Sequence, residues 1–590
     1  MVEPLAAGAM DPQEIERELR EFLGKRFGGA VQLAGAVPFG VPQPQADGEG
    51  PEQPPAPAAA PLPVFDLKPE QLEAYLDQFV VRQDAAKEVL ATKVCTHYNR
   101  IKLFREHPGE SRFAGVGQIK SNILMLGPTG VGKTYLVKLI AKKIGIPFVK
   151  GDATKFSETG YVGADVEDLV RDLVREAGGD VRLAEHGIVY IDEIDKIASA
   201  PSSFGPDVSR TGVQRALLKP MEETDVELRV AHDMVSQMEA LQDWQRTGKR
   251  EKKTVSTRNI LFILSGAFTG LDEIVKRRLA RTEIGFCAAE TVPPGAPPSW
   301  YLRRAAAEDL IAYGFESEFV GRLPVTVVLD PLGEDDLFAI LRNPNCPVIQ
   351  GKKADFKAYG IDVHFEDEAL RKLAALAFLQ RTGARGLASV VEATLLKFEK
   401  KLPSTGIRRF VVTPELVDDP AGQLARLLAD PEDPDLAARF ERLAAVERAE
   451  LAQAVEAQAP ALRERCRLTL AAALTDLAVR RMAARGSDVE EACRAIEAAA
   501  AALDRFEAAF REKHGIALAL EPEARERLIV LGGGEAAAVE ALAARLFANY
   551  PLGLNLVRER TGREAFPLPA AAVDDAEGHL NGLIRETYAR

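Results

Sequence analysis

The chain has 590 residues, of which 46% are hydrophobic, so it is long enough for several folded cores. Its net charge of −13 gives no global basic character, which argues against nucleic acid as a partner. The cysteines lack any Cys-x-x-Cys spacing, so we expect neither a disulfide framework nor a zinc site. Residues 1–10 lack signal-peptide features and no stretch approaches the roughly 18 apolar residues of a membrane span, so we expect a cytoplasmic protein without membrane contact.

The first 63 residues divide into a short helix and a tether. Within residues 1–28, a helix start at Asp11 is followed by apolar residues with helical spacing from Ile15 to Leu23. We interpret this amphipathic helix as an adhesion element. Residues 29–63 are rich in Pro, Ala, Gln and Gly and cannot bury enough apolar surface to fold, so they are expected to be a disordered linker.

From residue 64 to about residue 330, apolar strand-like runs alternate with helical segments, as in a doubly wound α/β domain. Core strands are expected near residues 123–126, 188–191 and 260–264. In such a domain, ligands bind at the carboxyl ends of the strands.

A glycine-rich loop follows the first of these strands and precedes a helical run that ends at Ile144. Its glycines leave backbone N–H groups free to face phosphate, Lys133 can reach the β- and γ-phosphates, and the Thr134 hydroxyl can bind Mg²⁺. The pattern predicts an ATP site. The residues expected to contact nucleotide are Gly127, Pro128, Thr129, Gly130, Val131, Gly132, Lys133, Thr134 and Tyr135.

An Asp-Glu pair ends the second expected strand. Asp192 is placed to hold Mg²⁺ through water, and Glu193 can polarise the attacking water as general base. Such a pair alone is usually a solvated strand end, and it gains meaning from the glycine-rich loop. Together the two motifs predict ATP hydrolysis.

From about residue 65 to residue 417, roughly 60% of its length, the chain resembles ClpX, the AAA+ protein unfoldase. Beyond the two nucleotide motifs, the resemblance rests on Gly160–Gly163, Gly212–Lys219, Gly266–Asp272, Ile284–Phe286, Glu318–Pro324 and Thr382–Leu387. It implies a large α/β P-loop ATPase domain over residues 64–330 and a small helical domain over residues 331–417.

The resemblance also implies roles for residues outside the two motifs. Arg322 is similar to the arginine finger that reaches the γ-phosphate of a neighbouring subunit, and Arg385 is similar to the sensor that couples nucleotide state to rotation of the small domain. Val80 and Val81 match the aliphatic contacts to adenine, although alone they would be read as core. Ser265 is either the polar sensor near the attacking water or a plain strand-end hydroxyl.

A finger that acts in trans requires a closed ring, and six subunits is the family number. Tyr161 and Val162, between flexible glycines, resemble the pore loop that grips unfolded or tagged protein substrates. Ile284, Gly285 and Phe286 match the tripeptide that docks into a ClpP-type peptidase.

The chain also departs from the family pattern. No cysteine pairs precede residue 65, so the family's zinc module is missing and no zinc is expected. Arg82 stands where the family normally has glycine, and residues 222–258 are longer than usual and contain a basic run that is a solvated loop or a second pore loop.

Residues 418–590 lie beyond the resemblance and show helical periodicity throughout. Gly360-Ile361, Glu366, Glu368-Ala369 and Leu373 recur at the same separations as Gly515-Ile516, Glu521, Glu523-Ala524 and Leu528. This extension is thus expected to end either in a degenerate copy of the small domain, without the Gly-Ala-Arg sensor, or in a region that is similar by chance.

Two functions remain open at this point. The chain is an ATP-driven unfoldase that delivers substrates to a ClpP-type peptidase, or it is a non-proteolytic AAA+ remodelling chaperone. The Ile-Gly-Phe tripeptide favours the first. A third possibility, an inactive structural ring, conflicts with the intact Lys133, Asp192, Glu193, Arg322 and Arg385.

Overall fold

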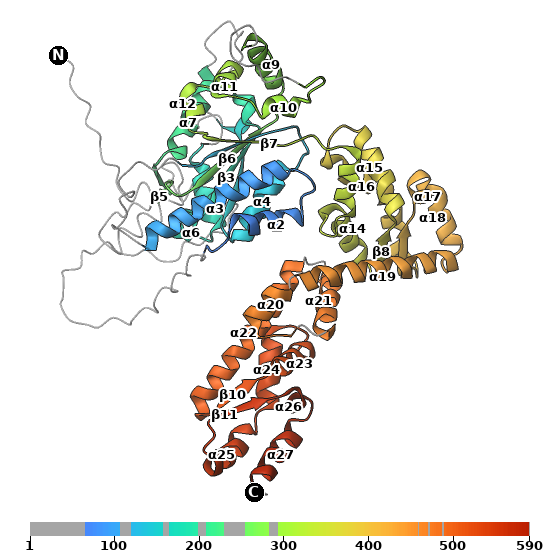
Figure 1. The fold of residues 1–590 in the computed structure, drawn as a ribbon. Coiled ribbons are helices and arrows are strands. Elements are labelled where there is room, and N and C mark those ends of the chain that lie inside the picture. Colours follow the sequence, from blue (N-terminus) through green and yellow to red (C-terminus); the bar gives the residue numbers. More distant parts are fainter. Residues whose placement is uncertain are drawn as a thin grey trace, which may run out of the picture. The chain divides into compact units, whose positions relative to one another are not determined.

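A computed structural model describes residues 65–106, 120–156, 165–198, 208–228, 254–282, 293–457, 459–469, 472–485 and 489–588. The described residues fold into an α/β domain, a small helical domain and a further mostly helical region (Figure 1). The N-terminal helix and linker expected before residue 64 lie outside the described residues.

The α/β domain is built on a five-stranded parallel sheet with strand order β2-β3-β6-β1-β7. The inner strands are buried on both faces, which explains their continuous apolar runs. This architecture confirms the predicted doubly wound α/β domain. The strands are β1 (Ile123–Leu126), β2 (Phe148–Asp152), β3 (Ile188–Asp192), β6 (Leu261–Gly266) and β7 (Val325–Val328).

Helices cover both faces of this sheet. Helices α2 (Pro69–Asp77), α3 (Asp84–Glu106) and α4 (Lys133–Ile144) share one apolar core with it (Figure 1). The other core includes side chains of α5 (Asp168–Glu176) and α7 (Val208–Met221). The remaining elements are α6 (Val181–Ala184), the antiparallel pair β4 (Asp225–Glu227) and β5 (Thr254–Ser256), α9 (Leu271–Thr282), α10 (Pro298–Leu302), α11 (Ala307–Tyr313) and α12 (Ser317–Gly321).

The small domain surrounds a parallel strand pair with helices and has its own core. That core runs from Leu337 to Leu427, so it includes a helix after residue 418. The elements are α13 (Glu334–Arg342), α14 (Pro347–Lys357), β8 (Asp362–Phe365), α15 (Asp367–Leu379), α16 (Ala384–Lys401), β9 (Arg409–Val412), α17 (Pro414–Asp418) and α18 (Pro420–Ala429).

The long helix α19 (Pro434–Ala457) leads from the small domain into the C-terminal region, which has a separate core. This region also contains a parallel strand pair, formed by β10 (Ala517–Leu520) and β11 (Ala565–Leu568). Its helices are α20 (Ala459–Cys466), α21 (Ala472–Arg485), α22 (Val489–His514), α23 (Pro522–Leu531), α24 (Ala536–Leu546), α25 (Tyr550–Thr561), α26 (Ala570–Asp574) and α27 (Ala576–Tyr588).

The sequence repeat falls at equivalent places in these two regions. The Glu366 N–H donates to the Val412 carbonyl at 3.1 Å, and the Glu521 N–H donates to the Leu568 carbonyl at 3.0 Å. Gly360 and Gly515 both have positive φ before their strands, at 74° and 65°. In both regions a helix, a strand and a second helix come in that order before the partner strand, and two helices follow the partner strand. The two regions therefore share this order of elements.

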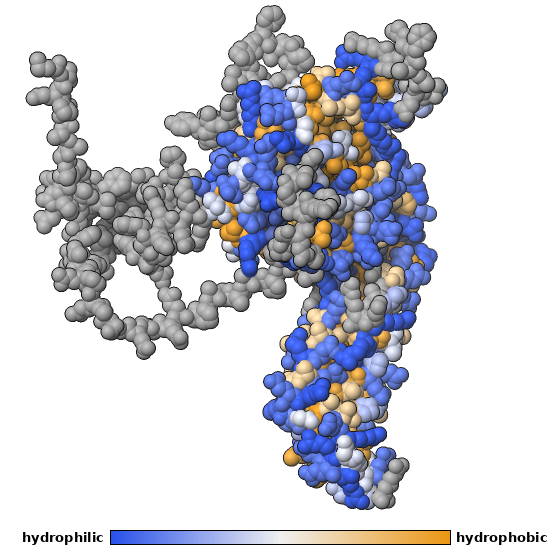
Figure 2. Space-filling model, turned by 60° about the vertical axis from the view of Figure 1, so that its left-hand side comes forward, coloured by the Kyte–Doolittle hydropathy of each residue, from blue (hydrophilic) through white to orange (hydrophobic). Residues whose placement is uncertain are grey.

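Large hydrophobic side chains are also exposed at matching places in the two regions. Leu376 on α15 and Leu531 on α23 are exposed, as are Leu396 on α16 and Leu552 on α25. Figure 2 shows hydrophobic residues of this kind lying between hydrophilic ones on the surface of the molecule.

Candidate functional site

The glycine-rich loop joins β1 to α4 and is in contact with the small domain. Gly130 has φ of 77°, and a Cβ placed there would lie 2.2 Å from the Thr382 carbonyl oxygen, which leaves no room for a side chain. Gly127 is similarly close to Leu329. Since α4 starts at Lys133, the unpaired N–H groups of its first turn lie at the loop, where an anion is stabilised.

Lys133 is buried and folded back over this loop. Its ammonium donates to the carbonyl oxygens of Gly127 at 2.6 Å and Pro128 at 2.9 Å. Burial lowers the pKa of Lys133, and the nearby carboxylates of Asp192 and Asp195 oppose that shift. The ammonium is thus held beside the loop that is expected to cradle phosphate.

A hydrogen-bonded network connects α4 with the ends of β3 and β6. The Thr134 hydroxyl lies 3.1 Å from the Tyr190 hydroxyl, which in turn lies 2.6 Å from Ser265 Oγ. Ser265 donates to Asp192 Oδ1 at 2.7 Å, and Thr134 Oγ1 lies 3.5 Å from Asp192 Oδ2. A hydroxyl and a carboxylate at this spacing are the oxygen donors that Mg²⁺ prefers, so the donor set fits that cation.

Asp192 is held in its charged form. Burial alone would raise its pKa, but hydrogen bonds from Ser265 and Lys150 outweigh burial and lower the pKa below its ordinary value. Tyr190 stays neutral because burial raises its pKa to about 12. The site therefore combines the charged Asp192 carboxylate with a network of neutral hydroxyl groups.

Glu193 follows in a left-handed backbone conformation, with φ of 59°. A non-glycine residue there costs about 1–3 kcal/mol, and such strain concentrates at functional sites. The Glu193 N–H donates to Asp192 Oδ1 at 3.1 Å, while its side chain is exposed at the end of the sheet. The Glu193 carboxylate is therefore accessible to solvent.

Arg385 lies near the glycine-rich loop because the turn between α15 and α16, called the hairpin below, contacts that loop. The Ala384 N–H donates to the Gly130 carbonyl at 2.8 Å, so the first residue of α16 touches the loop. Arg385 is the next residue and is exposed, and its charge contributes to the lowered pKa of Lys133. The expected sensor and the expected phosphate loop, more than 250 residues apart in sequence, are thus brought together.

Arg322 lies at the other end of the parallel strands from the phosphate loop, the end at which β1 and β7 begin. It precedes β7, in which Val325 pairs with Ile123 at the start of β1, whereas the phosphate loop follows the end of β1. Because β1 has 4 residues, roughly 13 Å separate its start from its end, where the phosphate loop follows. Arg322 forms an ion pair with Glu222 and is half-exposed, so it is directed away from the phosphate loop of its own chain.

Val80 is buried and Val81 is half-buried at the end of the α2–α3 connection. The next residues, Arg82 and Gln83, both have positive φ, at 61° and 66°. Arg82 pairs with Asp336 at 2.7 Å, and the Gln83 amide exchanges two 2.8 Å hydrogen bonds with the Asp330 backbone. The expected adenine segment therefore contacts Asp330, in the connection between β7 and α13, and Asp336 of α13, the first helix of the small domain.

Two residues of this site were missed by the sequence reasoning. The sequence pattern singled out neither Tyr190, which lies within the apolar run of the second expected strand, nor Lys150. The strand register of the structure brings them to the site, because Lys150 pairs with Tyr190 and Asp152 pairs with Asp192. Since residues two apart on a strand share a face, Lys150 lies on the same face as the Asp192 site.

The expected pore and docking residues Tyr161, Val162, Ile284, Gly285 and Phe286 lie outside the described residues, as does most of the 222–258 insertion.

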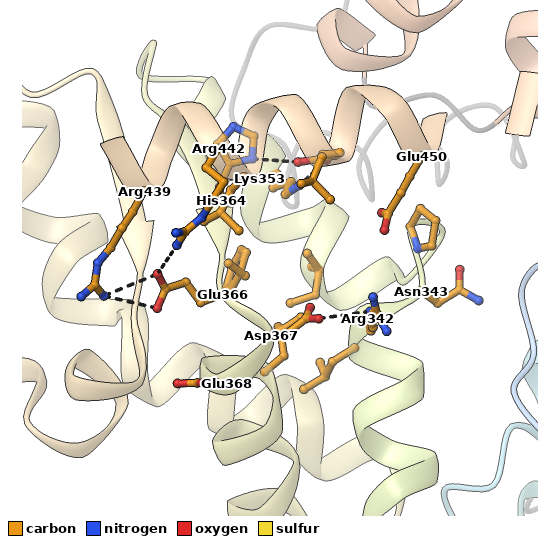
Figure 3. Close-up of a pocket in the computed structure, with 18 of the residues that line it drawn as sticks. Arg342, Asn343, Lys353, His364, Glu366, Asp367, Glu368, Arg439, Arg442 and Glu450 are labelled. Atoms are coloured by element: carbon orange, nitrogen blue, oxygen red, sulfur yellow. Dashed lines mark hydrogen bonds and ion pairs between the residues drawn. The ribbon is translucent and has the colours of Figure 1, made fainter. Parts of the chain in front are cut away.

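A hollow of about 550 Å³ lies away from this site, between the small domain and α19. Arg439 and Arg442 of α19 reach the Glu366 carboxylate at 3.5 and 3.9 Å (Figure 3). Glu447 of α19 accepts from His364 at 2.7 Å and pairs with Lys353. Several lining charges thus pair between α19 and the small domain, so we interpret the hollow as part of the contact between α19 and that domain.

Among the described residues, no group of three or more His, Cys, Asp or Glu side chains is arranged to hold a metal ion. No helix in the same ranges is long and apolar enough to cross a bilayer.

Residues 118–326 match the family model described as AAA domain (Cdc48 subfamily), and residues 332–402 match the C-terminal, D2-small domain, of ClpB protein. The chain is 41% identical over 356 residues to the ATP-dependent Clp protease ATP-binding subunit ClpX of Borrelia duttonii (strain Ly), which covers 59% of this chain and 78% of that protein. It is 39% identical over 352 residues to the same subunit of Treponema denticola, covering 59% and 81%. It is also 39% identical over 363 residues to ClpX 3 of Methylococcus capsulatus, covering 60% and 81%.

Proposed function

This chain belongs to the ClpX family of AAA+ ATPases, and we propose that it uses ATP hydrolysis to unfold proteins and to deliver them to a ClpP-type peptidase. The proposal is supported by relatives named as Clp protease ATP-binding subunits and by the arrangement of the nucleotide site. The observation that carries it is that Arg385 lies near the phosphate loop of its own chain, whereas Arg322 lies at the other end of the parallel strands.

The chain's own residues can perform hydrolysis at the loop. The N–H groups of residues 129–134 and the Lys133 ammonium would bind the phosphates. Thr134 and Asp192 would hold Mg²⁺, which would supply charge neutralisation at the phosphates. Glu193 orients the attacking water and takes its proton. Ser265 keeps Asp192 in position through its 2.7 Å hydrogen bond, which makes it a positioning residue in this scheme.

Arg322 supports an assembly in which each ATP site is completed by a neighbour. Because this side chain is directed away from its own loop, only another subunit's site can use it as an arginine finger. Such a head-to-tail interface closes into a ring, and six subunits is the number that we propose.

Nucleotide state can be transmitted to the small domain at two places. The hairpin before α16 touches Gly130, and the adenine segment is joined to the small domain by Arg82 and Asp336. A nucleotide that shifts either contact changes the angle at residues 329–333, which would move the ring. Tyr161 and Val162 would then pull polypeptide through the pore, and Ile284 to Phe286 would hold the peptidase.

The test is degradation of a fluorescent fusion that bears an unstructured tag, by the purified chain with ATP and a ClpP-type peptidase. We expect loss of fluorescence and release of peptides, with neither in the Glu193→Gln variant. Phe286→Ala should keep ATP hydrolysis and lose peptide release. Unfolding without cleavage in the unmodified chain would instead favour the remodelling chaperone, and no ATP-dependent unfolding would reject both functions.

A further inference from the structure

Asp192 has one oxygen committed to the protein and one that faces the nucleotide site. Oδ1 accepts from Ser265 Oγ at 2.7 Å and from the Glu193 N–H at 3.1 Å. Oδ2 lies 3.5 Å from Thr134 Oγ1, on the side where the magnesium ligands are expected. A cation held between Thr134 and Asp192, directly or through water, would therefore approach Oδ2.

Lys150 already contacts that oxygen. Its Nζ lies 3.0 Å from Asp192 Oδ2, and its side chain is 44% exposed, whereas the Asp192 side chain is 15% exposed. Lys150 belongs to the edge strand β2 and reaches the carboxylate along the sheet face, with Nζ 6.0 Å from the centre of the Tyr190 ring. The ring and the strand register hold the ammonium beside Asp192.

We propose that Lys150 is a positioning residue of the nucleotide site, a resident cation that holds Asp192 in the empty subunit and has to leave Oδ2 when a divalent cation binds there. Lysine suits this role because its ammonium is a single charge on a flexible four-carbon stem, so it can swing into solvent from the edge strand. Magnesium then binds at the cost of breaking an ion pair. The chain consequently needs more Mg²⁺ for nucleotide binding than it would need without this ammonium.

This inference rests on the proposed nucleotide site but not on protein unfolding. It is tested by binding of a fluorescent, non-hydrolysable ATP analogue to the full chain while Mg²⁺ is titrated. A chain that binds nucleotide but unfolds no protein would reject the proposed function and leave this test intact.

Lys150→Met keeps the stem and removes the charge. We expect it to lower the Mg²⁺ concentration for half-maximal binding by about two- to fivefold, the upper part of the range for loss of a partly exposed ion pair. Binding of the analogue in EDTA should be unchanged. Lys150→Arg keeps the charge and should stay within about twofold of the unmodified chain.

Lys138→Met is the matched control, because it removes an exposed ammonium from the adjacent helix α4. We expect no change in its Mg²⁺ midpoint. The inference is overturned if Lys150→Met leaves the midpoint unchanged or raises it, if Lys150→Arg shifts it as far as Lys150→Met, or if Lys138→Met shifts it equally. Thermal melting of each variant separates these results from a folding defect, since a misfolded variant would lose binding in EDTA as well.

Discussion

The small domain and the end of the C-terminal region share a backbone plan but differ at one turn. In the small domain, Gly383 and Ala384 join α15 to α16 and touch the phosphate loop. In the C-terminal region, Gly532 to Gly534 follow α23, and the extra helix α24 comes next, where a Cβ at Gly532 would meet Val539 of that helix. Both regions have their own core, and the comparison teaches that the connection after the first helix decides whether that core also contacts the phosphate loop or instead continues into the extra helix α24.

The similarity extends to the helix that ends each unit. Asp419 accepts from the Gly422 N–H at 3.0 Å, and Asp575 accepts from the Gly578 N–H at 2.9 Å. In both, the backbone of the capping residue is nearly identical, with φ of −133° and −141°. These matches concern packing and capping, so the two regions should respond alike to changes in stability and differently to changes that affect the nucleotide.

The largest effect is expected from glycine substitutions at the two kinds of turn. Gly130→Ala would place a Cβ 2.2 Å from the Thr382 carbonyl and should lower ATP hydrolysis by at least about 100-fold, because the loop and the hairpin must separate. Gly533 also has a positive φ, but a Cβ placed there would meet nothing within 4 Å. Gly533→Ala should therefore lower the free energy of unfolding by only about 1 kcal/mol. Steady-state ATPase rates check this, and comparable losses in both variants would contradict the comparison.

Matched core leucines should separate stability from activity. Leu373 and Leu528 occupy the same repeat position and are both fully buried, so replacement of either by Ala should destabilise its region by about 2–5 kcal/mol. Only Leu373→Ala should also lower ATP hydrolysis, since its domain carries the hairpin. Urea unfolding followed by limited proteolysis locates the loosened region, and an ATPase defect in Leu528→Ala would show that the C-terminal region acts on the nucleotide site.

The contact of α19 with the small domain, through Glu447, His364 and Lys353, should weaken in acid. Burial would raise the pKa of Glu447, but the hydrogen bond from His364 and the charge of Lys353 outweigh it and lower the pKa from 4.5 to about 2. A depressed pKa stabilises the folded state above pH 4.5, and this contribution, at most about 3 kcal/mol, is lost as pH falls toward 2. Proteolysis within α19 from pH 5 to pH 2.5 tests this, with Glu447→Gln expected to show cleavage that no longer depends on pH in that window.

The smallest effects are expected at the two caps. Asp419→Ala and Asp575→Ala should each cost about 1 kcal/mol, because each removes one accepted N–H bond at a helix start. Neither should change ATP hydrolysis. Equal shifts in urea midpoint would support the shared plan, whereas a shift in only one variant would show that the two caps differ in function.

Much of the nucleotide site could be predicted because its parts are local in sequence. A buried strand, three glycines, a lysine and a helix start stand in consecutive positions, and Asp192 with Glu193 end the next core strand. Local geometry follows from local sequence in both cases. The C-terminal repeat was visible for a related reason, because glycine before a strand and an acidic residue after it mark the ends of that strand.

The contacts between distant segments could not be predicted in the same way. Lys150 and Tyr190 needed the register of two neighbouring strands, and Gly130 needed the position of a hairpin 250 residues away. Neither register nor docking is written in a single stretch of sequence, because each depends on how buried faces pack. Residues 127–134 and 192–193 thus determined the chemistry by themselves, whereas only the tertiary structure decided that a lysine contacts Asp192 and that Arg322 faces away from its own loop.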